Sequence, residues 1–169
     1  AGLDPRKNHY RSLLACEALW KKGVKFRLRL VGSKGWMSDR IYEKIESLED
    51  AGHDLIYERR YITDHEMVEF VSSARVSLFV SEIEGFGLPI IESLYFGTPV
   101  MTSNHGSMLE ISELYGGCVT LPFDDVEAIS DALEKFVVDA GYAHTVYQSA
   151  RLDAGFEIQE YMDKVFGNR

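Results

Sequence analysis

Short apolar runs alternate along this chain with segments whose hydrophobic residues recur every three or four positions. The run at 76–80 (Val-Ser-Leu-Phe-Val) is typical of a strand buried in a parallel sheet. Elsewhere Ile41, Ile45 and Leu48 share one face of a helix. A glycine or proline stands at most junctions between such segments. The alternation predicts an α/β fold with a parallel sheet flanked by helices.

Turn residues and capping patterns set the expected boundaries of these elements. Thr63 and Glu66 have the spacing of a capping box, and Ser38 and Asp124 or Asp125 are expected to cap helices. The predicted strands cover residues 24–31, 55–57, 76–80, 100–102 and 118–121. The predicted helices cover residues 8–22, 38–52, a segment from 63, 88–96, a short segment after 106, a segment from 124 or 125, 142–152 and 156–166.

Composition limits the classes of function. The 169 residues suffice for one well-buried domain, and no apolar run approaches the roughly 20 residues of a membrane span. A formal net charge of −9 argues against nucleic acid or an anionic membrane as partners. Cys16 and Cys118 lack the spacing of metal ligands and are expected to pack as small hydrophobic residues. No secretory signal is visible, so we expect a soluble cytoplasmic protein, with any membrane association made through another part of a longer protein.

The segment from Glu84 to Glu92 carries the strongest functional signal. It follows the strand at 76–80, and its glycines, Gly85 and Gly87, allow the backbone to approach a ligand closely. Pro89 suits the first turn of a helix, whose free N–H groups attract phosphate or hydroxyl oxygens. The two carboxylates can accept hydrogen bonds from vicinal sugar hydroxyls. The segment therefore predicts a site for a phosphorylated, hydroxyl-rich ligand.

Glu84, seven intervening residues and Glu92 resemble the E-x7-E motif of family 4 retaining glycosyltransferases of the GT-B fold. Residues 5–8 resemble the phosphate-contacting loop of that family, and residues 61–67 resemble its loop near the nucleobase. Residues 96–104 resemble the turn and strand after the motif helix. The resemblance covers nearly the whole chain.

The resemblance implies that residues 1–169 form a single Rossmann-like domain, the C-terminal donor-binding half of a GT-B enzyme. The N-terminal acceptor domain is expected to be absent. The first strand of the family, which is central in such a sheet, is also expected to be absent, because the chain begins at Ala1-Gly2. An unpaired centre of a sheet invites pairing with another chain.

The resemblance also implies a role for each candidate residue. Glu84 would contact the donor sugar, and Lys7 would neutralise the leaving diphosphate as a second catalytic residue. A cation in the first turn of a helix is otherwise disfavoured by the helix dipole, which supports a ligand role for Lys7. Glu92 would bind the ribose hydroxyls. The other residues expected to bind the donor are Arg6, Tyr61, Ile62, Gly85, Phe86, Gly87 and Leu88.

No metal and no cofactor are expected apart from the donor substrate. Glu82 and Glu84 could imitate a divalent-cation site, but no further ligand cluster supports one. Ser103, Asn104 and His105 are interpreted as a polar turn rather than as catalytic residues.

The implied function is transfer of a hexose from a nucleoside-diphosphate sugar, with GDP-mannose the first choice, to a saccharide or lipid-linked acceptor. The isolated half is expected to bind the donor but not to turn it over. Two alternatives stay open: a sugar-nucleotide epimerase of GT-B shape, and a non-catalytic α/β binding module.

Overall fold

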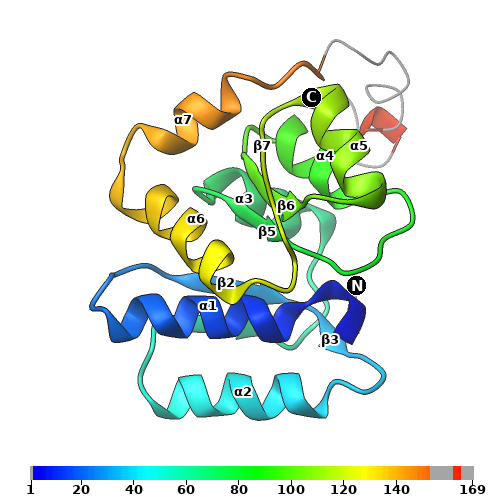
Figure 1. Cartoon of the computed structure of the whole chain (residues 1–169). Coiled ribbons are helices and arrows are strands. Elements are labelled where there is room, and N and C mark those ends of the chain that lie inside the picture. The colour runs from blue at the N-terminus through cyan, green and yellow to red at the C-terminus, as the bar shows by residue number, and fades with distance from the viewer. Residues whose placement is uncertain (1, 153–161, 165–169) are drawn as a thin grey trace.

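A computed structural model describes residues 2–152 and 162–164 as an alternation of helices and parallel strands (Figure 1). The first half contains β1 (Gly2–Leu3), the 3-10 helix η1 (Pro5–Lys7), α1 (His9–Lys21), β2 (Leu28–Val31), β3 (Ser33–Lys34), α2 (Asp39–Asp50), β4 (Leu55–Glu58) and α3 (Asp64–Ser73). The second half contains β5 (Ser77–Phe79), α4 (Leu88–Tyr95), β6 (Val100–Ser103), α5 (Gly106–Tyr115), β7 (Cys118–Leu121), α6 (Val126–Val138) and α7 (Tyr142–Tyr147).

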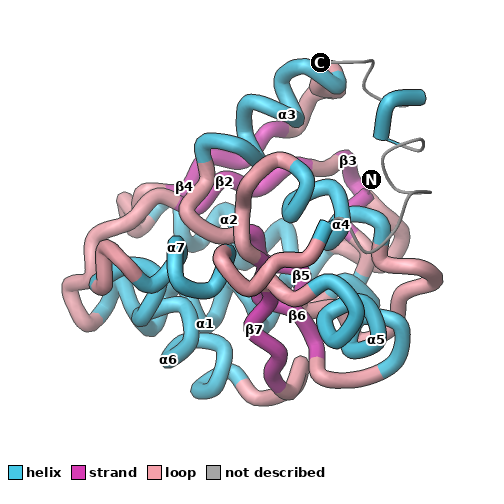
Figure 2. Tube along the Cα trace, turned by 90° about the horizontal axis from the view of Figure 1, so that it is seen from above, coloured by secondary structure: helices cyan, strands magenta, loops and turns pink. Residues whose placement is uncertain are grey.

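Every strand pairing in the described part of the chain is parallel. β1 pairs with β3, β2 pairs with β4, and β6 lies between β5 and β7. Seen from above, β2 and β4 form one group and β5, β6 and β7 form another (Figure 2). The predicted α/β class with parallel strands flanked by helices is confirmed.

The hydrophobic core lies on both faces of the strands. Met101 packs with residues of α1 and α6, including Cys16 and Phe136. Its neighbour Val100 packs with α4 and α5, because consecutive residues of a strand point to opposite faces. A third cluster joins α2 to β4 and to Leu3 of β1. The site segment between β5 and α4 is therefore held by a strand and a helix that are both anchored in the core.

Local capping patterns explain several helix starts. Thr63 Oγ1 accepts a hydrogen bond from the N–H of Glu66 at 3.2 Å, and the Glu66 carboxylate accepts one from the N–H of Thr63 at 2.8 Å. This confirms the predicted capping box at α3. Asp125 caps α6 through a 2.9 Å bond from the N–H of Ala128. Ser38 occupies the N-cap position of α2, but its hydroxyl donates instead to the carbonyl of Gly35 at 2.7 Å, so its predicted capping bond is wrong.

A short strand opens the described part of the chain. Gly2 and Leu3 form β1, a two-residue strand in parallel register with Ser33 and Lys34. Leu3 is completely buried against α1 and α2, and this burial holds the short strand in place.

The helix expected at 142–152 is shorter in the structure. It ends at Tyr147, after which the N–H of Gly117 donates to Ser149 Oγ at 2.9 Å and the N–H of Arg151 donates to the carbonyl of Tyr115 at 2.7 Å. These bonds hold the chain against the turn between α5 and β7 instead of continuing the helix. Most of the helix expected at 156–166 lies outside the described residues.

The two cysteines pack as expected. Cys16 is fully buried and Cys118 is half-buried, and burial raises the pKa of the Cys118 thiol to about 11. Both behave as small hydrophobic residues. Among the described residues, no helix has the length and apolar character needed to cross a bilayer.

Candidate functional site

The segment between β5 and α4 is held in place by hydrogen bonds from residues at and just after the end of β6. Ser103, which is fully buried, donates its hydroxyl to the carbonyl of Ser81 at 2.5 Å. His105 Nε2 lies 2.7 Å from the carbonyl of Glu82, to which it donates. These bonds fix the backbone ahead of Glu84, which supports a structural role for Ser103, the last residue of β6, and for His105.

The side chain of Glu84 is oriented by the same segment. Ser81 is almost completely buried, and its hydroxyl donates to Glu84 Oε1 at 3.1 Å. Ser107 at the start of α5 donates its hydroxyl to the backbone carbonyl of Glu84 at 3.4 Å. The carboxylate is half-buried, so part of it remains accessible to a ligand.

The start of α4 has the geometry of an anion-binding helix terminus. Gly87 is the N-cap residue and has a φ of +79°, in the left-handed region that glycine adopts without strain. No side chain caps this helix, and Pro89 in its first turn has no N–H. The backbone N–H groups ahead of Pro89, together with the positive end of the helix dipole, can therefore face phosphate or hydroxyl oxygens. Phe86 is 65% exposed beside this terminus.

The 3-10 helix η1 brings two cations to the segment. The N–H of Glu82 donates to the carbonyl of Arg6 at 2.7 Å, so the two segments are joined backbone to backbone. Arg6 Nη2 lies 2.6 Å from Asp4 Oδ2, and the hydrogen bonds from Arg6 lower the pKa of Asp4 to about 2. The pKa of Arg6 is raised, first by the bond to Asp4, and the negative charge of Glu84 adds to this shift. Arg6 is therefore in electrostatic contact with the site carboxylate.

Lys7 and Glu92 line the same cavity, which has a volume of about 890 Å³. Pro89 and His9 also line it. Burial, and to a lesser extent the positive charge of Lys7, lower the pKa of His9 to about 4. Lys7 and Glu92 are both half-buried. Lys7 is the last residue of η1, and Glu92 lies in α4. The structure thus places a cation and a carboxylate along one cavity.

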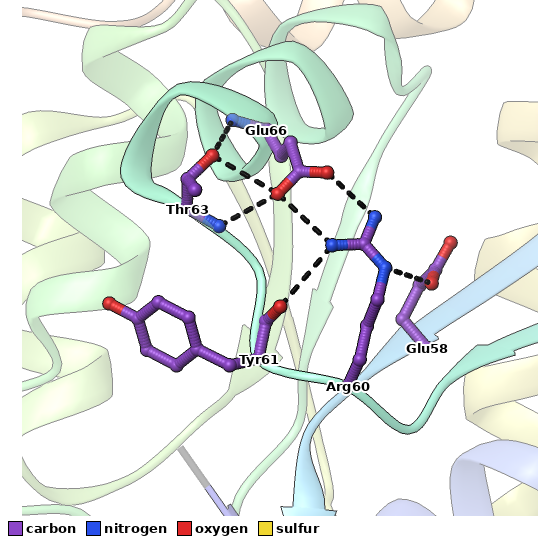
Figure 3. Close-up of polar contacts among 5 residues, drawn as sticks. All are labelled: Glu58, Arg60, Tyr61, Thr63 and Glu66. Carbon is purple, nitrogen blue, oxygen red and sulfur yellow. Dashed lines mark hydrogen bonds and ion pairs between the residues drawn. The ribbon is translucent and has the colours of Figure 1, made fainter.

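The predicted base-binding segment presents Tyr61 to solvent. Arg60 donates to both oxygens of the Glu66 carboxylate at 2.6 and 3.2 Å and to the carbonyl of Tyr61 at 3.2 Å (Figure 3). This network fixes the backbone, and the ring of Tyr61 points away from it and is 84% exposed. Ile62 is only 8% exposed, so its side chain packs into the protein. Of the two residues expected near a nucleobase, Tyr61 has the open aromatic face.

Two residues that hold the site were missed by the sequence analysis. Asn8 is 3% exposed and has a φ of +57°. Its Nδ2 donates to the carbonyl of Phe123 at 2.6 Å, which fixes the turn between Lys7 and α1. Ser81 orients Glu84, as described above. Asparagine tolerates the left-handed backbone conformation, so the turn at Asn8 could have been predicted from its residue type. The residues around Ser81 contain no pattern that indicates its role.

A metal cluster was not expected here. Within residues 2–152 and 162–164, no group of three or more histidine, cysteine or acidic side chains is placed to hold a metal ion.

Comparison with known proteins assigns the family. Residues 1–153 match the family model described as "Glycosyl transferases group 1". The chain is 31% identical to the serotype-specific mannosyltransferase WbdA of Escherichia coli over 82% of its own length and 17% of that protein. It is 35% identical to the O-antigen chain mannosyltransferase B of Escherichia coli over 76% of its length and 33% of that protein. The chain belongs to the glycosyl transferases group 1 family, and it spans a third or less of these two relatives.

Solved structures agree on the fold. The C-terminal domain of LpcC, a glycosyl transferase group 1 family protein from Francisella tularensis, superposes with a TM-score of 0.74 at 20% identity and covers 90% of this chain and 79% of that one. The trehalose-6-phosphate synthase OtsA superposes with a TM-score of 0.74 at 14% identity, covering all of this chain and 42% of that one. The fold is that of one Rossmann-like half of a GT-B glycosyltransferase.

Proposed function

We propose that this chain is the donor-binding domain of a family 4 retaining glycosyltransferase, which transfers a hexose from a nucleoside-diphosphate sugar. The observation that carries the proposal is the uncapped start of α4 at Gly87, with Glu84 before it, Glu92 within the helix and Arg6 tied to the same segment. A helix terminus binds the diphosphate, and carboxylates bind hydroxyl groups of the sugar and ribose. These chemistries belong to different parts of one nucleotide sugar.

Each side chain has a place in this proposal. Gly85, Phe86, Gly87 and Leu88 supply backbone N–H groups to the diphosphate or sugar. Lys7 and Arg6 balance the phosphate charge, with Arg6 already sharing its charge with Asp4. Glu92 accepts hydrogen bonds from the ribose. Tyr61 offers its exposed ring to the nucleobase, and Ile62 supports that segment from within the core.

Catalysis would follow from charge that develops in the transition state. As the bond between the sugar and the diphosphate breaks, negative charge grows on the leaving phosphate, where Lys7 and the α4 dipole stabilise it. Positive character grows on the sugar ring, where the Glu84 carboxylate stabilises it. Fixed donors of this kind would take the part of a divalent cation, so we propose a metal-independent reaction. The acceptor would be positioned by a second domain, so this half alone would bind the donor without turnover.

The relatives support a mannose donor. WbdA and the O-antigen chain mannosyltransferase B are both named as mannosyltransferases. We therefore propose GDP-mannose as the donor and a saccharide or lipid-linked saccharide as the acceptor, in the synthesis of a bacterial-type polysaccharide.

Calorimetric titration of the chain with GDP, UDP and ADP in the presence of EDTA tests this proposal. Saturable binding of GDP, with weaker binding of the other two, is expected. Replacement of Glu92 by alanine should weaken GDP binding by about 1 to 3 kcal/mol through lost hydrogen bonds. Glu110→Ala is the matched control, because Glu110 is exposed on α5 and should leave affinity unchanged. Equal affinity for GDP in the Glu92→Ala variant and the wild type would remove Glu92 from the site.

Experiments on the same protein also distinguish the two alternative functions from a glycosyltransferase. Conversion of the sugar nucleotide without any acceptor would favour an epimerase. Absence of binding to any nucleoside diphosphate would favour a non-catalytic module.

A further inference from the structure

A turn outside the candidate donor site presents two neighbouring apolar side chains to solvent. Residues 35–38 connect β3 to α2, and we call them the Trp36 turn. Trp36 is 82% exposed and Met37 is 65% exposed. Covering such side chains with a ligand removes apolar surface from water, which is favourable. The turn is therefore a candidate contact surface.

The Trp36 turn is held in a fixed conformation. Ser38 is almost completely buried, and its hydroxyl donates to the carbonyl of Gly35 at 2.7 Å across the turn. Gly35 packs so closely on β1 that a Cβ there would overlap the carbonyl oxygen of Leu3. Met37 has a φ of +53°, a left-handed conformation that side chains other than asparagine and aspartate disfavour. The fold thus holds two apolar side chains in a constrained and exposed arrangement, which is typical of residues placed for a ligand.

The Trp36 turn lies at the same edge of the strands as the donor site. Leu3 pairs in parallel with Lys34, so the turn and the segment that contains Arg6 both follow the carboxyl ends of their strands. Figure 1 shows the start of the chain and the turn after β3 on the same side of the molecule. The backbone path from Trp36 through this pair to Arg6 is about 24 Å when fully extended. An oligosaccharide is long enough to contact both.

The charges around the turn favour a neutral ligand. No residue of the Trp36 turn is ionisable. Lys34 and Asp39, which flank it, form an ion pair of 3.0 Å, and the guanidinium of Arg40 lies over the ring of Tyr10, 4.0 Å from its centroid. These cations already have partners, so an anionic headgroup or a phosphate gains little here.

The size of the surface favours a small ligand. An aromatic side chain such as Trp36 buries about 150 to 250 Å², far below the roughly 800 Å² that each partner buries in a stable protein interface. A sugar ring fits this size, because one face of a pyranose presents C–H groups that pack on an aromatic ring while its hydroxyls stay at the rim. The charged groups of Lys34 and Asp39 beside the turn can bond such hydroxyls.

We propose that the Trp36 turn is a stacking platform for the saccharide chain of the acceptor. This inference rests on the function proposed above, in which a second domain positions the acceptor for reaction. Trp36 would contact a sugar unit further along the same saccharide. It would therefore act on the choice of acceptor and not on donor binding.

The two tryptophans of the chain allow a direct test by NMR. Trp20 Nε1 already donates to the carbonyl of Phe26 at 3.1 Å, and its ring stacks on those of Phe26 and His53. Its indole N–H resonance is therefore the internal reference for that of Trp36. The isotope-labelled chain is titrated with linear mannotetraose, to tens of millimolar, with and without GDP.

Three variants are titrated in the same way, with the amide resonances of Gly35 and Ser38 as the readout of affinity. Trp36→Phe keeps an aromatic face and Trp36→Ala removes it. Leu114→Ala is the matched control, because Leu114 is also an exposed apolar residue but lies on α5. All three changes are at exposed positions, so the fold should be retained.

Mannotetraose should shift the Trp36 indole resonance saturably and leave that of Trp20 in place. Trp36→Ala should weaken saccharide binding at least tenfold, whereas Trp36→Phe and Leu114→Ala should change it less than threefold. The affinity for GDP should be equal in all four forms. No saturable shift at tens of millimolar saccharide, or equal saccharide affinity in Trp36→Ala, would overturn the proposal while donor binding persists. Absence of GDP binding by the wild-type chain would instead count against the proposed function, whatever the saccharide result.

Two other occupants of the turn give distinct results. A shift of the Trp36 resonance that grows with protein concentration, without saccharide, would indicate a second copy of the chain. Binding to phosphatidylglycerol vesicles that is lost in Trp36→Ala would indicate a lipid surface. Either result, in the absence of saccharide binding, would overturn the proposal.

Discussion

Replacement of Gly87 by alanine tests the geometry of the segment that carries the site. Gly87 has a φ of +79°, and an alanine there adopts the left-handed conformation at a cost of about 1 to 2 kcal/mol. Its Cβ would also lie 3.0 Å from Ile111 Cδ1 and 3.4 Å from Ile90 Cδ1. Both isoleucines are buried, so their room to move is small.

The reduced freedom of the unfolded chain offsets about 0.4 to 1 kcal/mol of this cost. These two terms leave a loss of roughly 0 to 1.6 kcal/mol, and the contact with Ile111 adds to it. A loss of about 1 kcal/mol corresponds to a fall in Tm of roughly 2 to 4 °C for a domain of this size. Urea denaturation followed by circular dichroism measures the difference.

Gly85→Ala is the matched control, two residues earlier in the same segment. Its Cβ would meet no heavy atom within 4 Å, and its φ lies outside the left-handed region. We expect a change within about 0.5 kcal/mol. If Gly87→Ala proves as stable as Gly85→Ala, the left-handed turn and the contact with Ile111 do not constrain this segment, and the reasoning is refuted.

Three further predictions concern the surroundings of the site. Because the pKa of His9 is lowered to about 4, its stabilising contribution is complete above pH 6.5 and is lost as the pH falls toward 4; urea denaturation at several pH values should give a shallower slope for His9→Gln. Thr63→Ala removes the capping bond to Glu66 and should cost about 1 kcal/mol in the same assay, whereas Thr63→Ser, which keeps the hydroxyl, should cost less. Ser103→Ala leaves the buried carbonyl of Ser81 unpaired and should cost about 1 to 3 kcal/mol, with weaker GDP binding by calorimetry; unchanged stability would show that this bond does not anchor the segment.

Sequence reasoning succeeded where the determining interactions are local. Thr63 and Glu66 of the capping box are three positions apart, and the start of α4 depends on Gly87 and Pro89, which are two positions apart. Strand and helix positions followed from hydrophobic spacing, because the two faces of β6 bury consecutive residues against different helices.

The contacts that position the site were not predictable, because they join distant segments. Asn8 bonds to Phe123, and Ser103 bonds to Ser81, through pairs that have no pattern in the sequence. Ser38 looked like a helix cap, yet the nearby carbonyl of Gly35 competes for its hydroxyl. β1 was not predicted because two residues carry no periodicity, and its strand character comes from pairing with Ser33 and Lys34.

The measurement that tests the central claim most directly is a titration of the isotope-labelled chain with GDP, followed through its backbone amide resonances. The account predicts that the largest shifts fall on Gly87 and Leu88 at the start of α4 and on Lys7 in η1, with smaller shifts near Tyr61. Saturable shifts confined to other parts of the molecule, or no shifts at millimolar GDP, would contradict the assignment of this segment as a diphosphate site.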